Sequence, residues 1–364
     1  MNILILNWRD INHPRAGGAE VRLHEVYSPL TKQGHKVILF SSLFKNAKKN
    51  DFIDGINISR LGNDFTFSFL CMINLSKWVK NYSIDVVVED LNKLPFYSPL
   101  VYKGPLIIQM HHLWKKSIFH EVSFFIALSI WLSEKSISWV YKNCNFSVVS
   151  SSTKKELNKL GISNKQIKVI YNGIDLDLYK PRKVEKKLVL LWVGRIQRYK
   201  GPIEACKILK LLLNDFPNLK LVIVGDGPYR KKVEDFVNQN QLPVKFTGFL
   251  NKEEKISWFQ TASIHLQSSY KEGWGLSIIE ANACGCPVVA NDTTGLCDSV
   301  QNGKTGLLYE YNNIKDGALK IKLLLENKDL CKRLISSGLE WSKEFSWEKN
   351  SKEIFALLEK KIND

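Results

Sequence analysis

The 364-residue sequence predicts an α/β protein with two doubly wound domains, each built on a parallel β-sheet. Short runs of β-branched residues alternate with helix-period patterns along nearly the whole chain, and this alternation is typical of parallel sheets. The length exceeds that of one ordinary core, because domains usually contain about 100 to 200 residues. Apolar residues make up 45% of the chain and charged residues 24%, a balance typical of globular proteins.

The first half of the chain is expected to alternate strands with helices. The expected strands cover residues 2–8, 36–41, 85–89, 106–110, 146–150 and 168–171. The expected helices cover residues 19–33, 68–80, 117–142 and 153–160. The strand segments are short and mostly apolar, as strands buried on both faces are.

The second half repeats this pattern. The expected strands cover residues 188–193, 220–224, 244–247, 264–267, 287–290 and 306–308. The expected helices cover residues 202–214, 228–240, 252–260 and 276–284. At the end of the chain, Trp347, Ile354, Phe355 and Leu358 recur at near-helical spacing and predict a terminal helix.

A domain boundary is expected in residues 175–187, where Pro181 and the charged stretch RKVEKK interrupt the periodicity. The predicted first domain covers residues 1–178 and the second covers 179–345, followed by the terminal helix at 346–364. The N-terminal MNILILNW predicts a strand rather than a secretion signal, because it lacks a basic start and its apolar run is short.

The chain carries a formal net charge of +16, which predicts an anionic partner such as nucleic acid, an anionic membrane or a phosphorylated ligand. The lysines are scattered, and an arginine-rich arm, a zinc finger and an RNA-recognition motif are missing from the sequence. Nucleic acid is therefore not an expected partner. A second interpretation, in which the lysines only solvate the surface, stays open.

The seven cysteines form no paired framework and mostly lie in apolar segments, which is typical of reduced cysteines in a cytosolic protein. Cys284 and Cys286 are separated by one residue instead of the two usual in metal knuckles, so no metal site is expected there.

Residues 122–132 are uncharged, yet this run is well short of the ~20 residues that a spanning helix needs. One interpretation buries the segment as the core face of a long helix. The other lays it on an anionic bilayer, with Trp114 and Trp131 at the headgroup level and lysines beside them. A second apolar patch at 65–70 would share that surface.

Gly17 and Gly18 follow the first expected strand and precede a helix. Glycines in this place allow a close approach of the backbone to a ligand, and the helix N-terminus presents free N–H groups to phosphate. The segment is not the dinucleotide fingerprint, because the third glycine is missing. A nicotinamide enzyme is therefore not favoured.

Arg195 and Lys200 follow the first expected strand of the second domain. Two cations beyond the carboxyl end of a strand can neutralise a diphosphate, the arginine by a bidentate fork and the lysine as a point charge. We therefore predict that this pair holds a diphosphate.

The stretch KEGWGLSIIEANACGCPVVA holds Glu272 and Glu280 around the glycines Gly273 and Gly275, ahead of an apolar strand. Eight helical steps cover about 12 Å, close to the span from the ribose to the hexose of a nucleotide sugar. Each carboxylate could then accept hydrogen bonds from one of these diols. The helix start at Gly275 and Leu276 would offer N–H groups to the phosphates between them.

These motifs together resemble those of the retaining glycosyltransferases of family 4, which have the GT-B fold. The resemblance rests on AGGAE, YNGID, VGRIQRYKG, VGDGP, FTGFL, the two-glutamate stretch and NGKTGLLY. It implies two Rossmann-like domains facing a cleft, with the C-terminal helix packing back on the first domain. It also implies a nucleotide sugar as donor substrate, no further cofactor and no divalent metal.

The resemblance assigns the site residues one by one. Glu272, Arg195 and Lys200 fall on the family's catalytic positions, with Glu280 and the Gly17–Gly18 loop on its donor-binding positions. Gly248 and Phe249 fall on the strand end that binds the base. A histidine that touches the transferred sugar corresponds to His111 or His112, and His111, nearer the strand end, is favoured.

The expected reaction is transfer of a hexose-type sugar with retention of configuration, in which the leaving phosphate oxygen takes the acceptor's proton. The acceptor is either a saccharide linked to a lipid such as polyprenyl diphosphate, at the inner face of the cell membrane, or a soluble metabolite. A nucleotide-sugar epimerase is a less favoured alternative, because it would be expected to place acids and histidines in the cleft rather than two glutamates at this spacing.

Overall fold

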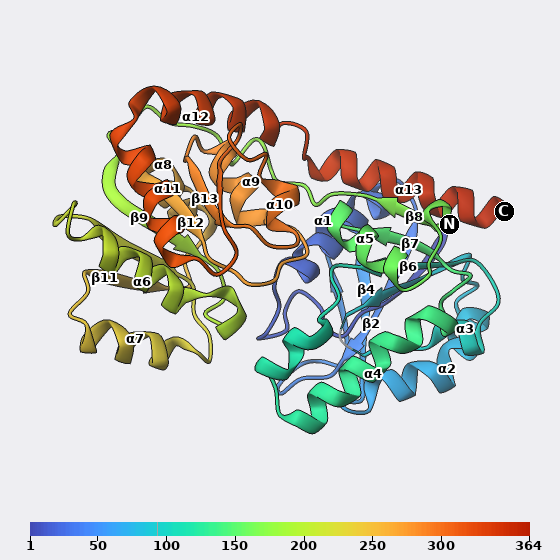
Figure 1. Cartoon of the computed structure of the whole chain (residues 1–364). Helices are drawn as coiled ribbons and strands as arrows, with labels where there is room; N and C mark the ends of the chain where they lie inside the picture. Colours follow the sequence, from blue (N-terminus) through green and yellow to red (C-terminus); the bar gives the residue numbers. More distant parts are fainter. Residues whose placement is uncertain (93) are drawn as a thin grey trace. The chain divides into compact units, whose positions relative to one another are not determined.

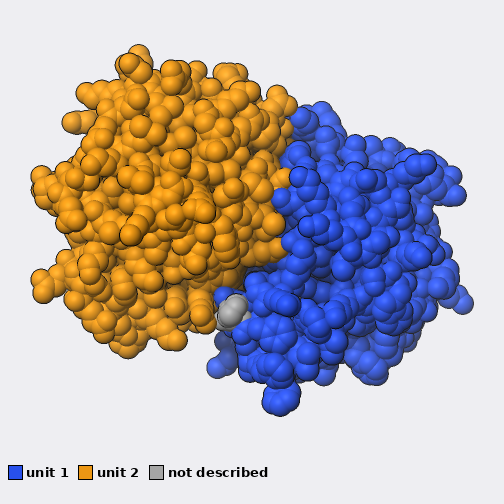
Figure 2. All heavy atoms as spheres, in the orientation of Figure 1, with its two compact units in different colours: residues 1–173, 347–364 blue, residues 174–346 orange. Residues whose placement is uncertain are grey.

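The computed structural model of the protein describes residues 1–92 and 94–364, which form two compact units. Unit 1 contains residues 1–173 and 347–364, and unit 2 contains residues 174–346 (Figure 2). Each unit is a layered α/β structure built on its own sheet (Figure 1). The predicted architecture of two parallel sheets is confirmed.

Unit 1 has, within its described residues, an eight-stranded sheet in the order β3-β4-β2-β1-β5-β6-β7-β8. The strands are β1 Asn2–Leu6, β2 Lys36–Ser42, β3 Asn50–Ile53, β4 Ile56–Leu61, β5 Val86–Leu91, β6 Leu106–Met110, β7 Asn145–Val148 and β8 Ile167–Val169. The helices are α1 Gly18–Lys32, α2 Phe67–Asn81, α3 Ser98–Val101, α4 Phe124–Val140, α5 Ser151–Lys159 and α13 Trp347–Asn363, with short 3₁₀ turns η1 Lys115–His120 and η2 Asn164–Gln166.

Alternate residues of the unit 1 strands point to opposite faces, and each face is covered by helices. Ile3 and Ile5 of β1 pack in the cluster that contains residues of α1 and α13. Leu4 and Leu6 pack in the cluster that contains residues of α2, α4 and α5. The terminal helix α13 therefore lies on the first unit, as predicted, and Ser351 Oγ of this helix donates a 2.7 Å hydrogen bond to the carbonyl oxygen of Val26 in α1.

The antiparallel hairpin of β3 and β4 is missing from the sequence prediction, which expected no strand between residues 41 and 85. Asp54 and Gly55 connect the two strands with φ angles of 51° and 85°. Positive φ at both central residues defines a type I′ turn, for which Asp-Gly is a favoured sequence. The sequence therefore carries a local signal for this hairpin, although an antiparallel hairpin departs from the alternation of strands and helices in the rest of the chain.

The helix expected at 117–142 is interrupted. The chain forms the 3₁₀ turn η1 first, and α4 begins only at Phe124. Each of the two interpretations of the apolar segment fits one side of α4, because one side of this helix is buried and the other is exposed. Ala127, Ile130 and Ile137 are buried, whereas Phe125 is 82% exposed.

Unit 2, whose residues are all described, has a six-stranded parallel sheet in the order β11-β10-β9-β12-β13-β14. The strands are β9 Lys187–Val193, β10 Lys220–Val224, β11 Val244–Gly248, β12 Ala262–Gln267, β13 Val288–Asn291 and β14 Leu307–Tyr309. The helices are α6 Pro202–Leu212, α7 Arg230–Gln239, α8 Lys252–Thr261, α9 Leu276–Ala283, α10 Leu296–Ser299, α11 Ile314–Glu326 and α12 Lys328–Ser342, and η3 Arg198–Lys200 is a 3₁₀ turn.

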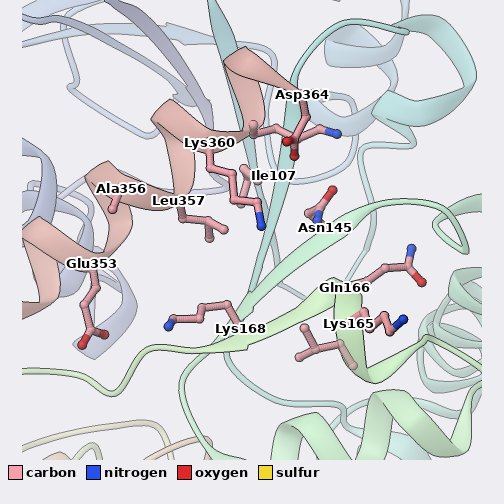
Figure 3. Close-up of a pocket in the computed structure, with 12 residues that line it drawn as sticks. Ile107, Asn145, Lys165, Gln166, Lys168, Glu353, Ala356, Leu357, Lys360 and Asp364 are labelled. Atoms are coloured by element: carbon pink, nitrogen blue, oxygen red, sulfur yellow. The ribbon is translucent and has the colours of Figure 1, made fainter.

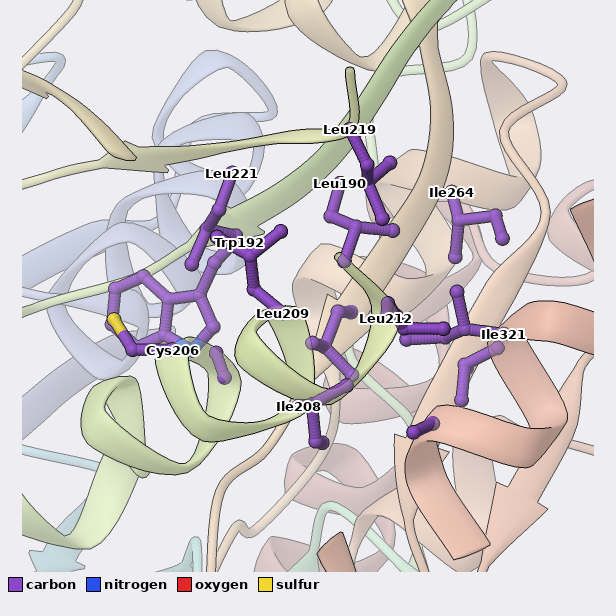
Figure 4. Close-up of a cluster of buried hydrophobic side chains, with 14 of the residues drawn as sticks. Leu190, Trp192, Cys206, Ile208, Leu209, Leu212, Leu219, Leu221, Ile264 and Ile321 are labelled. Carbon is purple, nitrogen blue, oxygen red and sulfur yellow. The ribbon is translucent and has the colours of Figure 1, made fainter. Parts of the chain in front are cut away.

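The core of unit 2 packs α6 and α11 against the central strand β9 (Figure 4). Trp192 of β9 is fully buried, and its indole N–H donates a 3.1 Å hydrogen bond to Ser268 Oγ. Helices α11 and α12 were not predicted, although Asn313 and Asn327 cap them by accepting backbone N–H groups of Asp316 and Leu330. An asparagine ahead of an apolar periodic run is a helix-start signal that could have located both.

Candidate functional site

The sheet order of unit 2 places a topological switch point at β9 and β12. The chain runs from β9 outward through β10 to β11, and then returns to β12 on the other side of β9. Open α/β sheets bind ligands outside the carboxyl ends of the strands at such a point. Arg195 and Lys200 follow β9, and Glu272 follows β12.

Lys200 and Glu272 form an ion pair at this point. Lys200 Nζ lies 2.6 Å from Glu272 Oε1, and the two side chains are only 17% and 11% exposed. The same carboxylate oxygen accepts hydrogen bonds from Ser269 Oγ at 2.8 Å and Gln267 Nε2 at 3.2 Å. The structure thus brings together two residues that the sequence placed 72 positions apart on different motifs.

The ion pair keeps Lys200 charged despite its burial. Burial by itself lowers the pKa of the Lys200 ammonium, but the Glu272 carboxylate and Tyr199 together outweigh burial, so that the net pKa is raised. The nearby Arg195 guanidinium acts in the opposite direction on the same pKa. The two predicted cations are therefore close enough to influence one another, as a shared diphosphate site requires.

Close backbone contacts hold the two loops together. Gly201 has a φ of 67°, and a Cβ on it would come within 2.1 Å of the Ser268 carbonyl oxygen. Ser268 Oγ donates a 2.6 Å hydrogen bond to the Gly201 carbonyl, and the Tyr270 N–H donates to the Tyr199 carbonyl at 2.8 Å. Glycine is required at this position because a side chain would push apart the loops that carry Lys200 and Glu272.

A third segment supports the Glu272 loop and was missed in the sequence. Asn291 Nδ2 donates to the Ser269 carbonyl at 3.1 Å, and Thr293 Oγ1 donates to the Tyr270 carbonyl at 2.7 Å. Gly295 has a φ of 82°, and a Cβ on it would lie 2.4 Å from the Glu272 carbonyl oxygen. The Thr-Thr-Gly triplet one residue after β13 was the available signal, because glycines near strand ends mark close approaches of the backbone.

Glu280 lies on α9 in a separate set of contacts. Its Oε1 lies 2.8 Å from Lys255 Nζ, and its side chain is 9% exposed. Burial, and then the Glu280 carboxylate, raise the pKa of the neighbouring Tyr179 hydroxyl far above its usual value. Helix α9 begins at Leu276, so only four of the eight steps from Glu272 are helical. The all-helical span of about 12 Å expected from the sequence is therefore wrong.

The glycines between the glutamates are buried, and Gly275 is sterically confined. A Cβ on Gly275 would lie 2.5 Å from Ser299 Oγ and 2.7 Å from Ile278 Cδ1. Gly275 occupies the N-cap of α9, with Leu276 as the first helical residue, and Gly273 lies in the loop before it. A side chain at Gly275 therefore has no room. The Leu276 N–H, which the sequence analysis offered to the phosphates, instead donates a 2.9 Å hydrogen bond to the Trp274 carbonyl, so that part of the prediction is wrong.

The predicted base-binding segment lies at the end of β11. Gly248 has a φ of 72°, and its carbonyl accepts a 2.9 Å hydrogen bond from the Gly225 N–H at the end of β10. The neighbouring Phe249 is 77% exposed. An aromatic ring exposed to this extent is available for stacking.

In unit 1 the predicted glycine loop caps α1. Gly17 is the N-cap residue, and its N–H donates a 2.6 Å hydrogen bond to Glu20 Oε2. Burial raises the pKa of Glu20. An acidic side chain therefore already occupies one N–H donor that the sequence analysis offered to a phosphate, whereas Gly18 stays exposed.

His111 lies directly after β6 and contacts an acidic residue from the neighbouring strand β5. Its Nε2 is 3.2 Å from Asp90 Oδ2, and both side chains are largely buried. Thr153 Oγ1 donates a 3.0 Å hydrogen bond to the His111 carbonyl. His112 instead packs its ring edge-on against Trp114 at 4.9 Å. Of the two histidines, His111 is the one held by Asp90.

Two charged residues near the unit 1 loops were not predicted. Arg22 of α1 is fully buried, and its burial lowers the pKa of the guanidinium, while the charge of Asp90 opposes this effect. Asp10 lies in the loop before Gly17 and forms a buried ion pair with Arg60 of β4, at 2.7 Å. Neither has a sequence signal, because the partners are far apart in the chain.

Within the described ranges, no three His, Cys, Asp or Glu side chains gather in a way that could hold a metal ion.

Residues 16–178 match the family described as Glycosyltransferase Family 4, and residues 175–341 match the family described as Glycosyl transferases group 1. An uncharacterized glycosyltransferase of Methanocaldococcus jannaschii is 37% identical over 206 residues, which cover 55% of each chain. The chain thus spans about half the length of the curated relatives it matches.

Two solved structures share the fold over nearly the whole chain. Sucrose-phosphate synthase from Thermosynechococcus elongatus has a TM-score of 0.82 at 22% identity, covering 99% of this chain and 98% of the other. Anabaena HepE in complex with UDP-glucose has a TM-score of 0.77 at 20% identity, covering 99% and 100% of the two chains. At these identities the likeness concerns the fold, which is GT-B.

Proposed function

The protein is a member of glycosyltransferase family 4, whose enzymes are retaining and metal-independent, and on this premise we propose that it transfers a hexose-type sugar from a nucleotide-diphosphate sugar to a saccharide acceptor. The observation that carries the proposal is the Lys200–Glu272 pair at the switch point of unit 2. A buried cation beside a carboxylate offers one group for a diphosphate and one for sugar hydroxyls.

In this proposal Lys200 and Glu272 give up their contact with each other and instead contact the nucleotide-sugar donor. Lys200 and Arg195 hold the diphosphate, and Glu272, still held by Ser269 and Gln267, accepts a hydrogen bond from a sugar hydroxyl. The bond between the anomeric carbon and the phosphate oxygen breaks as the acceptor oxygen attaches to that carbon on the same face. The acceptor's proton passes to the departing phosphate oxygen, and the two cations stabilise its growing charge.

The remaining unit 2 residues receive the nucleoside. Glu280, oriented by Lys255 and Tyr179, accepts hydrogen bonds from the ribose diol. The backbone at Gly248 and the exposed ring of Phe249 contact the base. The N-terminal end of α9 at Gly275 is assigned to the phosphates, because a helix N-terminus favours negative charge.

In unit 1, His111 is proposed to touch the transferred sugar, with Asp90 fixing the orientation of its ring. The exposed Gly18 leaves the backbone open to the donor or acceptor at the start of α1. Unit 1 is otherwise assigned to the acceptor, and the predicted division of the chain at 178 and 345 stays a prediction.

A nucleotide-release screen tests this function. UDP-, GDP- and ADP-sugars are offered in excess EDTA, each with a lipid extract or with soluble sugars as acceptors. We expect one nucleotide sugar to be consumed without added metal, because side-chain cations serve the diphosphate. NMR of the product should show the donor's anomeric configuration. Activity that needs magnesium or manganese, or an inverted linkage, would refute the proposed mechanism.

We also propose that the acceptor is lipid-linked and that unit 1 binds the anionic inner face of the cell membrane from the cytoplasm. The support is an apolar surface on α4 and at the start of α2, two helices on the same face of the sheet. Its exposed residues are Phe65, Phe69, Ile73, Phe124, Phe125, Ile126, Leu132 and Trp139. No helix in the described part of the chain has the length and apolar character to cross a bilayer.

Lysines accompany this surface. Lys115 and Lys116 precede α4 and are exposed, and Lys135 Nζ lies 3.7 Å from the centroid of the Trp131 ring. A helix that buries aromatic side chains at the level of the headgroups binds through apolar area plus attraction to anionic lipid. Each lysine near the surface adds about 1 kcal/mol.

Vesicle flotation tests the membrane proposal. The protein should float with vesicles that contain phosphatidylglycerol at low salt, and the double variant Phe65→Asp/Phe125→Asp should remain in the soluble fraction. Both side chains are more than four-fifths exposed, at 87% and 82%, so folding should be unaffected. Phe52→Asp is the matched control, because Phe52 is 67% exposed on β3, away from these helices. Equal flotation of the double variant would contradict the proposal.

A further inference from the structure

A pocket of about 350 Å³ lies at the edge of the unit 1 sheet where strands begin (Figure 3). Ile107, Asn145 and Ile167 line it, and they stand at the starts of the neighbouring strands β6, β7 and β8. Asp90 and His111 lie at the opposite, carboxyl-terminal edge of the same sheet. The pocket is therefore separate from the candidate site of unit 1.

The other wall of the pocket is one side of the terminal helix α13. The lining residues on this side are Glu353, Ala356, Leu357, Lys360 and Lys361 of the helix and Asp364, which directly follows it. Their spacings of three, one, three, one and three place them in a single stripe along the helix. Ile354 and Leu358, between them in sequence, face the sheet core instead. The stripe thus borders a groove beside the strand starts.

Four lysines converge on this groove from two separate parts of the chain. Lys165 and Lys168 come from η2 and β8, and Lys360 and Lys361 come from α13. Figure 3 shows Lys168 and Lys360 extending into the space between the helix and the strands. In the part of the chain that the structure describes, none of the four ammonium groups has a carboxylate oxygen within 4.0 Å.

The charges in the pocket are unbalanced. Glu353 and Asp364 also line it, but they are two carboxylates against four ammonium groups, and neither forms an ion pair with these lysines. The floor between the charges is apolar, with Ile107, Ile167 and Leu357. A pocket with a cationic rim and an apolar floor suits an anion that carries a small organic group.

We propose that this pocket binds a phosphate-bearing ligand of small size, as a second anion site distinct from the diphosphate site of unit 2. Lysine ammonium groups bind phosphate as point charges, and several can share the oxygens of one phosphate. The volume lies near the lower end of the ~300 to 1,000 Å³ usual for ligand pockets. The ligand is a free phosphate ester or the headgroup of a phospholipid, because both present the same chemistry.

Calorimetric titration of the full chain with inorganic pyrophosphate tests the site. Two binding events are expected, and Lys200→Ala should remove the event that belongs to unit 2. In that background, Lys168→Gln/Lys360→Gln should weaken the remaining event by at least about tenfold, since two charge-assisted contacts are lost. Lys155→Gln/Lys159→Gln is the matched control, because it removes two exposed lysines of the nearby α5 that do not line the pocket.

A second arm distinguishes the sources of the phosphate. Glycerol 3-phosphate represents the free ester, and phosphatidylglycerol vesicles represent the headgroup, with the Phe65→Asp/Phe125→Asp background used to remove binding through the apolar surface. Binding of either probe that depends on Lys168 and Lys360 supports the site and identifies the source. Binding that is unchanged in the pocket variant, or that falls equally in the Lys155/Lys159 control, overturns the proposal. Activity is not the readout, so the result is independent of the proposed transfer reaction.

Discussion

Replacing Lys200 by methionine is expected to lower the transfer rate at saturating donor by at least about 100-fold. A hydrogen-bond donor that contacts charge developing in the transition state typically raises the catalytic rate by a factor of about 10² to 10³. Lys200 is the cation best placed for this role, because burial and Glu272 together fix its ammonium at the carboxyl end of β9. Removal of Glu272 by Glu272→Gln should also lower transfer, since the sugar hydroxyl would lose its charged acceptor.

The ion pair complicates the interpretation of either single change. Losing one partner leaves a poorly solvated charge, and this destabilises the protein whatever the role in catalysis. The double variant Lys200→Met/Glu272→Gln separates the two effects. It removes both charges, so we expect the free energy of unfolding of unit 2 to recover most of the loss in the single variants, while transfer stays at least as low.

The control for this experiment is Lys322→Met. Lys322 also pairs with a carboxylate, Asp215 at 2.8 Å, but both side chains are more than one-third exposed and lie away from the strand ends. An exposed ion pair contributes little, typically below about 1 kcal/mol, so transfer and stability should both stay near those of the unchanged protein. Transfer near the original rate in Lys200→Met, or recovered transfer in the double variant, would remove the lysine from the mechanism.

The sequence was informative where a structural feature depends on neighbouring residues. Strands β6 and β10 occur at the predicted residues, because a run such as Lys220–Val224 is apolar enough to be buried on both faces. The hairpin of β3 and β4 was also encoded locally, by Asp54 and Gly55, but an edge hairpin does not fit the alternation of strands and helices that guided the prediction.

The sequence did not predict features that depend on residues brought together by the fold. The glutamate motif indicated that Glu272 and Glu280 matter, yet nothing in it revealed that Lys200 pairs with the first and Lys255 with the second. The same limit applies to Gly17, whose N–H is taken by Glu20. Spacing along the chain predicts neighbours within one helix, and it does not predict which loops from different strands meet.

The buried pair of Asp10 and Arg60 should have the largest effect on stability. Arg60 Nε and Nη2 donate to the two carboxylate oxygens at 2.7 and 2.9 Å, and the side chains are 1% and 0% exposed. Asp10 also accepts from Ser41 Oγ and the Asn12 N–H, both at 3.0 Å, so the pair anchors the loop between β1 and α1 to the sheet. Arg60→Met should cost about 3 to 5 kcal/mol at pH 7, because it leaves a buried carboxylate without its cation.

The pH dependence gives this prediction its sign. Burial alone would raise the pKa of Asp10, but the hydrogen bonds and charge of Arg60, with the hydrogen bonds from Asn12 and Ser41, outweigh burial, and the folded pKa is lowered below 3.8. A lowered folded pKa contributes stability that is present above the unfolded pKa and is lost as the pH falls through the folded pKa. Without Arg60, burial raises the folded pKa of Asp10. Protonation of Asp10 at low pH therefore reduces the loss of stability in Arg60→Met.

The free-energy difference between the unchanged protein and Arg60→Met should therefore shrink as the pH falls from 7 toward about 4 and below. Amide hydrogen exchange in β1, β2 and β4 measures it, because these strands report on unit 1 without requiring the whole chain to unfold in one step. The double variant Asp10→Asn/Arg60→Met removes both charges and should regain much of the loss at pH 7 while showing little dependence on pH. A difference between Arg60→Met and the unchanged protein that stays constant from pH 7 to 4 would mean that the lost packing of Arg60, and not the charge on Asp10, sets the cost.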